Sequence, residues 1–398
     1  MKKVIKFFGI FAACSVILTS CDWFNTLKLY NATFTFTPDD NIEVADLTDI
    51  TLIVTGPEVD TLKLNSLDPV TDLLVQGQYT ATLTARVQDD ATAQISGYAT
   101  FDLFEEKQVN IDLTLSYQSP LVFKTIYSTG GAQYYVLDSY VEIVNNSDEV
   151  QYLDGLMLAC PLGNLKQESA WQVAFPDKYN SGQGAVLAFP GNGTDYPLQP
   201  GEFIVLADQA MNHKLAYGTD ESKKEEYAKS PDLSGANWEK YYGNGDTDNE
   251  NVPNMKVVYT NNKSMKMWAF GVSGRAYMLI RLPEGMTPEQ FAADENNYST
   301  TPNTSSTTLF MLFPSKYILD AVDIYGNGVA AESNYPFFLA KDDAKGVEAS
   351  PTYAGKCVRR KVEKIVNGRV YYKDSNNSSV DFKNNQDNTP GLVPNSID

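Results

Sequence analysis

The chain has 398 residues, and its 50 Asp and Glu residues outnumber its 31 Lys and Arg residues, for a formal net charge of −19. Nucleic acids and anionic lipid surfaces bind clustered positive charge, so this balance argues against both as partners. His213 is the single histidine. Zinc sites built on several histidines are therefore excluded, and the usual Ser-His-Asp and Cys-His systems lack parts, so we expect no enzyme activity and an exposed loop position for His213.

Residues 1–20 have the pattern of a lipoprotein signal peptide. Three lysines precede an apolar run that ends in Leu-Thr-Ser-Cys at Cys21. Small residues before a cysteine admit a signal peptidase, and several acyl chains on Cys21 would anchor the chain stably. No later apolar run is long enough for a spanning helix. We therefore expect an outer-membrane lipoprotein of a Gram-negative bacterium, held in the membrane by acyl chains on Cys21 and facing either the periplasm or the surface.

Residues 21–119 are predicted to contain the lipid anchor and a small β-sandwich. Short runs with alternating apolar and polar residues follow one another from residue 27 to residue 117, and Gly, Pro, Asn and Asp separate them. This pattern is typical of antiparallel strands joined by tight turns. The run GQYTATLTA at residues 77–85 resembles a strand of carboxypeptidase-regulatory-like and transthyretin-like stalk domains. The resemblance implies a spacer or docking module without chemistry of its own.

Residues 120–398 are predicted to form one larger β domain. Apolar runs such as LVFKTIY, SYVEIVN, EFIVLAD and AYMLIRL read as strands, and polar insertions separate several of them. Short helices are expected in KKEEYAKS and after Thr287, an N-cap candidate that is followed by a proline suited to a first helical turn. The fold class is therefore all-β, with two antiparallel immunoglobulin-like sandwiches, the second enlarged by insertions with short helices.

Four motifs in the second domain resemble those of the lamin-tail domain, an immunoglobulin-like sandwich of nuclear lamins and of many bacterial envelope proteins. They are Glu142-Ile-x-Asn145, Leu153-x-Gly155, Pro200-Gly201 before an apolar strand, and Pro390-Gly391 with Asn395. The chain departs from the family at Leu156, where a tryptophan is usual. The family resemblance implies a scaffold or binding module.

A glutamate inside an apolar strand raises the question of what Glu142 does. Catalysis, metal binding and architecture are the alternatives, and no nucleophile or general acid lies nearby in the sequence. We expect Val141 and Ile143 to face the core, Glu142 to bond backbone groups, and Asn145 to set the following turn.

Cysteines, aromatic residues and acids supply the other candidate site residues. Cys160 and Cys357 could form a disulfide in an oxidising compartment or could be two buried apolar residues. Tyr335, Phe337 and Phe338 are further candidates for exposed aromatic residues, and they could equally be core residues or part of a protein interface. The remaining candidates are a glycan or partner contact at Trp238, Tyr241 and Tyr242, which could equally be packing residues, and a calcium site at Asp246, Asp248 and Glu250, which could equally be a solvated acidic loop.

The basic run GKCVRRKVEK at residues 355–364 stands out from the acidic background. As a strand it would carry Arg359 and Arg360 on opposite faces. Charges of this kind protect edge strands from pairing with other chains, so we expect an edge strand, with a partner contact or internal ion pairs as alternatives.

The whole arrangement is also similar to a family of Bacteroides-type envelope lipoproteins without an assigned activity. The resemblance implies an envelope protein, and work beside an outer-membrane transporter or another envelope protein is an expectation of that family type. Our principal hypothesis is a non-catalytic lipid-anchored binding or scaffold module that acts through protein contacts at the outer membrane. A glycan-binding lipoprotein is the second hypothesis, and a hydrolase with a carboxylate pair is the third. No cofactor is expected apart from the calcium candidate.

Overall fold

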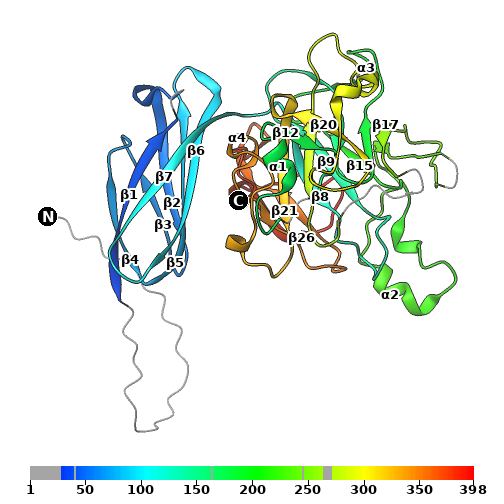
Figure 1. Cartoon of the computed structure of the whole chain (residues 1–398). Coiled ribbons are helices and arrows are strands. Elements are labelled where there is room, and N and C mark those ends of the chain that lie inside the picture. Colours follow the sequence, from blue (N-terminus) through cyan, green and yellow to red (C-terminus); the bar gives the residue numbers. More distant parts are fainter. Residues whose placement is uncertain (1–27, 40–41, 163–164, 244–245, 263–270) are drawn as a thin grey trace, which may run out of the picture.

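The computed structural model describes residues 28–398 except 40–41, 163–164, 244–245 and 263–270. The signal peptide and Cys21 lie outside the described residues. Within them, no helix has both the length and the apolar character needed to cross a membrane. The protein is all-β, with a smaller sandwich beside a larger one and only short helices (Figure 1).

The first sandwich holds its core between two layers that share one strand. The strand order is β3-β2-β5-β6-β7-β1-β4. The first part of β7 pairs in parallel with β1 and its last part pairs with β6, so β7 passes from one layer to the other. Side chains from both layers, such as Phe34 and Leu83, are fully buried in a common core. The strands are β1 (Leu29–Pro38), β2 (Leu47–Thr55), β3 (Val59–Lys63), β4 (Val70–Val75), β5 (Gly77–Val87), β6 (Asp90–Leu103) and β7 (Lys107–Tyr117).

The second sandwich consists of two six-stranded sheets with further layers outside them. One sheet has the order β16-β15-β9-β8-β23-β26 and the other β17-β13-β11-β18-β21-β22. The strands of the first sheet are β8 (Leu121–Tyr127), β9 (Tyr140–Asn145), β15 (Phe203–Ala207), β16 (Trp238–Glu239), β23 (Lys356–Arg360) and β26 (Phe382–Asp387). Those of the second are β11 (Met157–Ala159), β13 (Ala185–Ala188), β17 (Lys256–Thr260), β18 (Ala276–Ile280), β21 (Ile318–Tyr325) and β22 (Val347–Glu348).

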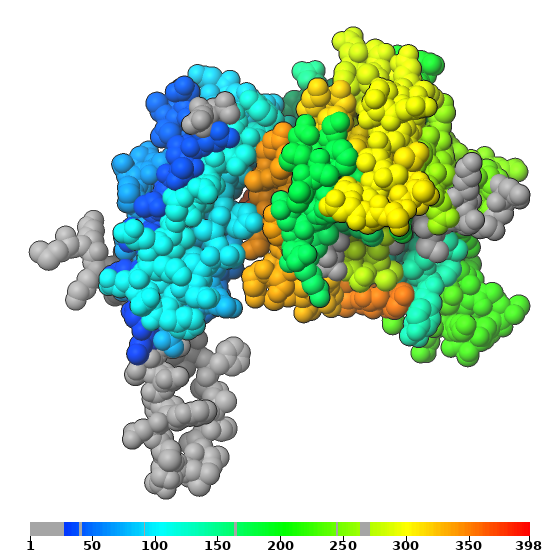
Figure 2. All heavy atoms as spheres, viewed as in Figure 1, coloured from blue at the N-terminus to red at the C-terminus, as the bar shows by residue number. Residues whose placement is uncertain are grey.

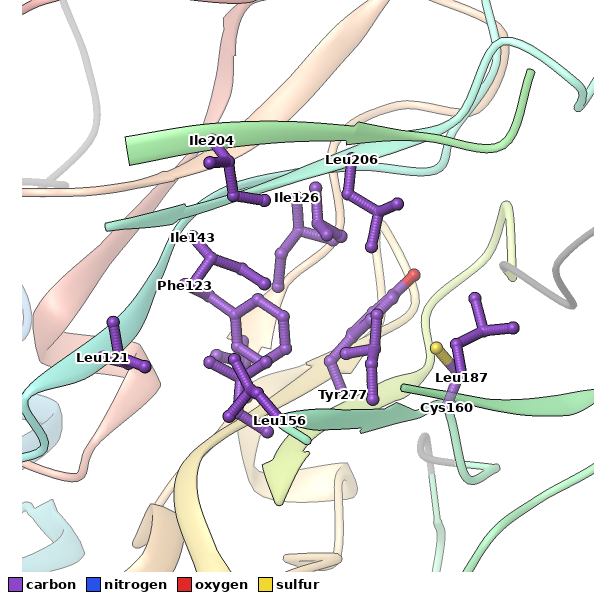
Figure 3. Close-up of a cluster of buried hydrophobic side chains, with 14 of the residues drawn as sticks. Leu121, Phe123, Ile126, Ile143, Leu156, Cys160, Leu187, Ile204, Leu206 and Tyr277 are labelled. Carbon is purple, nitrogen blue, oxygen red and sulfur yellow. The ribbon is translucent and has the colours of Figure 1, made fainter. Parts of the chain in front are cut away.

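The main core lies between these two sheets. Figure 3 shows Phe123, Ile143 and Leu206 of one sheet facing Tyr277 and Leu187 of the other. Apolar side chains that alternate along each strand create this packed layer, because alternate residues point to the same face.

Short elements cover the outer faces of both sheets. The three-stranded sheet β12-β20-β19 and helix α3 cover one outer face, where Phe291 stacks on Phe313. Thr287 caps α3 through a capping box with Gln290, as its sequence predicted. The remaining short elements of the second domain are β10 (Gln151–Tyr152), β12 (Lys178–Asn180), β14 (Pro197–Leu198), β19 (Tyr298–Thr300), β20 (Leu309–Pro314), β24 (Val362–Val366), β25 (Arg369–Tyr372), α1 (Ala170–Ala174), α2 (Lys224–Tyr227), α3 (Pro288–Ala293), α4 (Ala340–Asp343) and α5 (Ser378–Asp381).

Candidate functional site

Glu142 has the architectural role that its sequence predicted. Val141 and Ile143 lie in the main core, while Glu142 lies on the other face of β9 and is fully buried. Its Oε2 pairs with Lys124 Nζ at 2.8 Å, and its Oε1 accepts a hydrogen bond from the backbone N–H of Gly391 at 2.6 Å. Burial lowers the pKa of Lys124, and Glu142 opposes that shift. The glutamate thereby ties the C-terminal segment to the sheet.

Asn145 joins the turns at the end of the same strand. Its side-chain amide donates to the carbonyl oxygens of Glu149 and Leu198, each at 2.8 Å. Its own carbonyl oxygen accepts from the N–H of Gly201 at 2.9 Å. Residues from three of the four sequence motifs therefore meet around β9.

The edge-strand prediction for the basic run is wrong. Strand β23 lies inside its sheet, between β8 and β26, and Arg360 is buried. Arg360 contacts Asp320 at 2.6 Å and Asp374 at 3.1 Å, and Asp381 lies 3.8 Å away. Burial of an arginine without acidic partners would cost several kcal/mol of desolvation free energy. Of the alternatives for the basic run, the structure therefore supports internal ion pairing.

His213 is buried, contrary to the expected loop exposure. Its Nδ1 lies 2.6 Å from the hydroxyl of Tyr135, and its Nε2 lies 2.9 Å from the carbonyl oxygen of Gln209. Burial lowers its pKa to about 4. The imidazole is thus neutral near neutral pH and holds two loops together.

The two cysteines do not form the disulfide that the sequence allowed. Both Cys160 and Cys357 are buried free thiols. Cys160 lies in the main core, and Cys357 lies in a separate cluster with Tyr127 and Tyr140. Burial raises the pKa of each thiol to about 12, which makes both unreactive.

The tryptophan proposed as a glycan or partner contact is a core residue. Trp238 is 4% exposed, and its ring packs edge-on against Phe189 and Tyr196. Tyr242 packs partly buried against the same core, and Tyr241 is half-buried. These three rings therefore do not form an exposed stacking surface, because Trp238, the first residue of β16, inserts between the two sheets.

The acids proposed for calcium have other partners. Asp246 Oδ2 accepts from Lys240 Nζ at 2.7 Å, and Asp246 Oδ1 accepts from Gln209 at 3.2 Å. Asp248 bonds Asn254, and Glu250 is exposed. In the part of the chain that the structure describes, no group of three His, Cys, Asp or Glu side chains is placed to hold a metal ion. Asp246 therefore neutralises a buried lysine in this structure.

Two tyrosines that were not among the candidates from the sequence, exposed Tyr134 and half-buried Tyr353, form an aromatic pair at the surface, called here the tyrosine pair. Tyr134 is 82% exposed, and its ring lies edge-on to that of Tyr353 with centroids 5.9 Å apart. Both residues have positive φ, 62° and 57°. Bulky residues rarely adopt this backbone conformation, which costs about 1–3 kcal/mol at each position and persists only where the surrounding structure imposes it. For Tyr134 the sequence offered one signal, the Gly130-Gly131 pair shortly before it, which is typical of an exposed turn.

The base of the Tyr134 loop is tightly bonded. Buried Asp138 accepts hydrogen bonds through Oδ2 from Tyr127, Ser230 and the N–H of Gly131 at 2.7–3.0 Å. Gly130 has a φ of 76°, and a Cβ there would lie 2.6 Å from the carbonyl oxygen of Tyr135. This base leaves the loop little freedom.

The loop that carries Tyr353 and helix α2 hold the pair in place. The N–H of Tyr353 donates to the carbonyl oxygen of Thr129 at 2.8 Å. The N–H of Gln133 donates to Glu226 of α2 at 2.5 Å. In Figure 1, α2 lies at the end of the second domain away from the first sandwich. The tyrosine pair is therefore a rigid aromatic surface at the far end of the molecule.

Comparisons with known proteins agree with the resemblance to a Bacteroides-type family. A model of the family described as "Protein of unknown function (DUF4876)" matches residues 199–389. The crystal structure of a DUF4876 family protein from Bacteroides thetaiotaomicron is similar, with 26% sequence identity and a TM-score of 0.58. That match covers 93% of this chain and 98% of the other, so it extends over both sandwiches. No curated protein matches the chain.

Proposed function

We propose that this protein is a non-catalytic, lipid-anchored envelope protein that binds another protein through the tyrosine pair. The observation that carries the proposal is the 82% exposure of Tyr134 in a conformation that costs backbone energy. Interface hot spots are rich in tyrosine, because a ring with two torsions buries a large area at little entropic cost. A partner contact is a reason for a chain to keep such strain.

The carboxylates with the strongest burial argue against the hydrolase alternative. A glycosidase needs two carboxyl groups that face a substrate cleft. Asp138, Asp320, Asp343 and Asp374 are all buried and accept hydrogen bonds from the protein itself. Their raised pKa values follow from burial, so they fit a structural role better than a catalytic one.

The anchor and the lamin-tail-like assignment are parts of the same proposal. The lipobox at residues 18–21 supports acylation of Cys21 and an outer-membrane location. The bonds of Glu142 to Gly391 and of Asn145 to Gly201 support a common module, because they join three of its sequence motifs. With the lipid at the N-terminus, the tyrosine pair would lie on the far domain, available to a neighbouring transporter or envelope protein.

Affinity purification from native membranes tests the proposal. The tagged full-length chain is extracted in mild detergent, and co-purifying proteins are quantified by mass spectrometry. We expect a stoichiometric partner with the wild-type chain and its loss with Tyr134→Ala. Phe104→Ala is the matched control, because Phe104 is an exposed aromatic residue of the first sandwich, at 59%. Recovery of the chain alone, or equal recovery of the partner with Tyr134→Ala, would contradict the proposed contact.

Fractionation tests the anchor separately. Cys21→Ser removes the thiol that would be acylated, so the chain should move from the membrane fraction to the aqueous fraction. Cys160→Ser is the control, since that thiol is buried in the second domain. Membrane retention of the Cys21→Ser chain after a high-salt wash would show that lipid on Cys21 is not the anchor.

A further inference from the structure

A cavity of about 460 Å³ lies at the boundary between the two sandwiches, and we call it the boundary pocket. Tyr98 of β6 forms its first-domain wall. The second domain contributes α1 with the turn after it and the segment 335–344 that leads into α4. In Figure 2 the cyan surface of the first sandwich faces the green α1 segment and the orange surface around α4. A volume of this size suits a small ligand.

The second-domain wall of the pocket is held by partly buried hydrogen bonds. Gln172 of α1 donates to the carbonyl oxygens of Pro336 and Phe337 at 2.8 and 3.2 Å. The hydroxyl of Tyr179 donates to Asp342 at 2.5 Å and accepts from the N–H of Leu339 at 3.0 Å. These bonds join α1, β12 and α4, so the wall is formed before any ligand arrives.

Aromatic rings form much of the pocket surface. Phe337 and Phe338 are buried beneath it, at 5% and 4% exposure, and pack on Tyr179. Tyr335 is 39% exposed, and Tyr98 is half-buried on the opposite domain. The accessible rings therefore come from both sandwiches, and a ligand between them would touch both.

Four polar groups of the pocket have no hydrogen-bond partner among the described residues. They are the hydroxyls of Tyr98 and Tyr335 and the charged ends of Glu168 and Lys178. The phenols can donate and accept, the carboxylate accepts, and the ammonium donates. One acid and one base leave the pocket without a net charge, so it favours neither an anion nor a cation.

We propose that the boundary pocket binds a neutral saccharide. A sugar ring presents an apolar face to an aromatic ring and hydroxyls that both donate and accept along its edge, which matches this set of groups. A phosphorylated ligand would require more positive charge than one lysine. An apolar ligand would leave the acid and the lysine without partners. The site is separate from Trp238, and it requires neither the lipid anchor nor a protein partner.

Saturation-transfer NMR on the full-length chain in detergent tests this proposal. The probes are neutral hexose and N-acetylhexosamine mono- and disaccharides, each at millimolar concentration. Irradiation of the protein's aromatic protons should transfer signal to the ring protons of at least one sugar. Tyr335→Ala should weaken binding of that sugar roughly tenfold, which corresponds to about 1.4 kcal/mol for the loss of one stacked ring.

Two further variants separate binding at this pocket from loss of folding. Tyr98→Phe keeps the ring and removes one hydroxyl, so it should weaken binding by roughly threefold to tenfold with an unchanged fold. Tyr134→Ala removes a more exposed tyrosine at the far end of the second domain and should leave sugar binding unchanged. The absence of transfer to every sugar, or equal binding by Tyr335→Ala and wild type, would overturn the proposal. Neither result bears on the protein partner of the tyrosine pair.

Discussion

At the scale of single residues, burial decides what a charged group does in this protein. Lys124 and Glu142 are both fully buried and pair at 2.8 Å. Lys124 Nζ also lies over the ring of Phe203, 3.5 Å from the ring centroid. Removal of one partner from such a pair costs more than the pair contributes, because the other charge stays buried.

Glu142→Gln should therefore destabilise the second domain by about 3 kcal/mol or more. Urea unfolding followed by tryptophan fluorescence measures the change. Glu149→Gln is the control, because Glu149 is an exposed acid of the next turn and should change stability by less than about 0.5 kcal/mol. Adding Lys124→Met to Glu142→Gln should restore part of the loss, and a double variant less stable than Glu142→Gln would contradict the ion-pair explanation.

The variant Tyr134→Gly distinguishes the backbone strain at Tyr134 from the proposed role of its ring in partner binding. Glycine adopts a φ of 62° without steric cost, so the variant should unfold at the same temperature as wild type or slightly above it. If the partner contact exists, the same variant should lose the partner. Thermal unfolding and affinity purification on one protein preparation measure both. A clear fall in unfolding temperature would mean that the ring stabilises the fold more than the strain opposes it.

At the scale of elements, the buried carboxyl groups around β21, β23 and α5 link stability to pH. Burial raises the pKa of Asp374 to about 7, although Arg360 lies beside it. Folding therefore favours the protonated form. The stability from this proton is fully present below the ordinary aspartate pKa of 3.8 and is lost as pH rises through about 7.

Asp374→Asn should flatten this part of the pH dependence. The amide is neutral at every pH. Its oxygen can accept the hydrogen bond that the N–H of Ser119 donates to Asp374 Oδ2 at 2.9 Å in the wild type. Between about pH 5 and pH 8 the wild type should lose more free energy of unfolding than the variant. Urea titrations at both pH values measure the difference. Exposed Glu105→Gln should behave as wild type, and an Asp374→Asn chain with the full wild-type pH dependence would assign that dependence to other groups.

At the scale of the whole molecule, a few polar contacts fix the position of the two sandwiches relative to each other. Gln94 and Gln118 both donate to the backbone carbonyl oxygen of Asp374, at 2.6 and 3.1 Å. Arg86 forms an ion pair with Glu363 across the same boundary. Because the Arg86 pair is partly exposed, the glutamine bonds contribute more to the fixed arrangement.

Gln94→Ala combined with Gln118→Ala should loosen the domains without unfolding either one. Small-angle X-ray scattering should then show a larger radius of gyration, and proteolysis near residues 118–120 should accelerate. Thr33→Ala removes a side-chain bond within the first sandwich and is the control. The sugar affinity of the boundary pocket should fall in the double variant as well, because its two walls belong to different domains. An unchanged scattering profile would mean that other contacts fix the arrangement.

The local sequence determined the all-β class, most strands, the cap at Thr287 and the role of Glu142. Alternating apolar residues and turn residues depend on only a few neighbouring positions, so they can be recognised without knowing which segments pack together in the fold. The local pattern did not predict β4 or β12, whose pairing partners β1 and β20 lie far along the chain. The prediction of an edge strand for the basic run was wrong. A charged strand reads as an edge strand in the sequence, but β23 is central because distant acids neutralise its buried arginine.

The tertiary structure alone decided which aromatic residues are exposed and which acids meet. Trp238 and Tyr134 follow similar polar, glycine-containing stretches of sequence, yet Trp238 fills the core and Tyr134 stays in solvent. Arg360 pairs with Asp320, which lies 40 positions away in the sequence, and Asp374 accepts a hydrogen bond from Ser119, which lies 255 positions away. Such contacts depend on how sheets and domains pack against one another. A periodic pattern specifies the face of a strand, whereas the identity of what packs on that face is set by the fold.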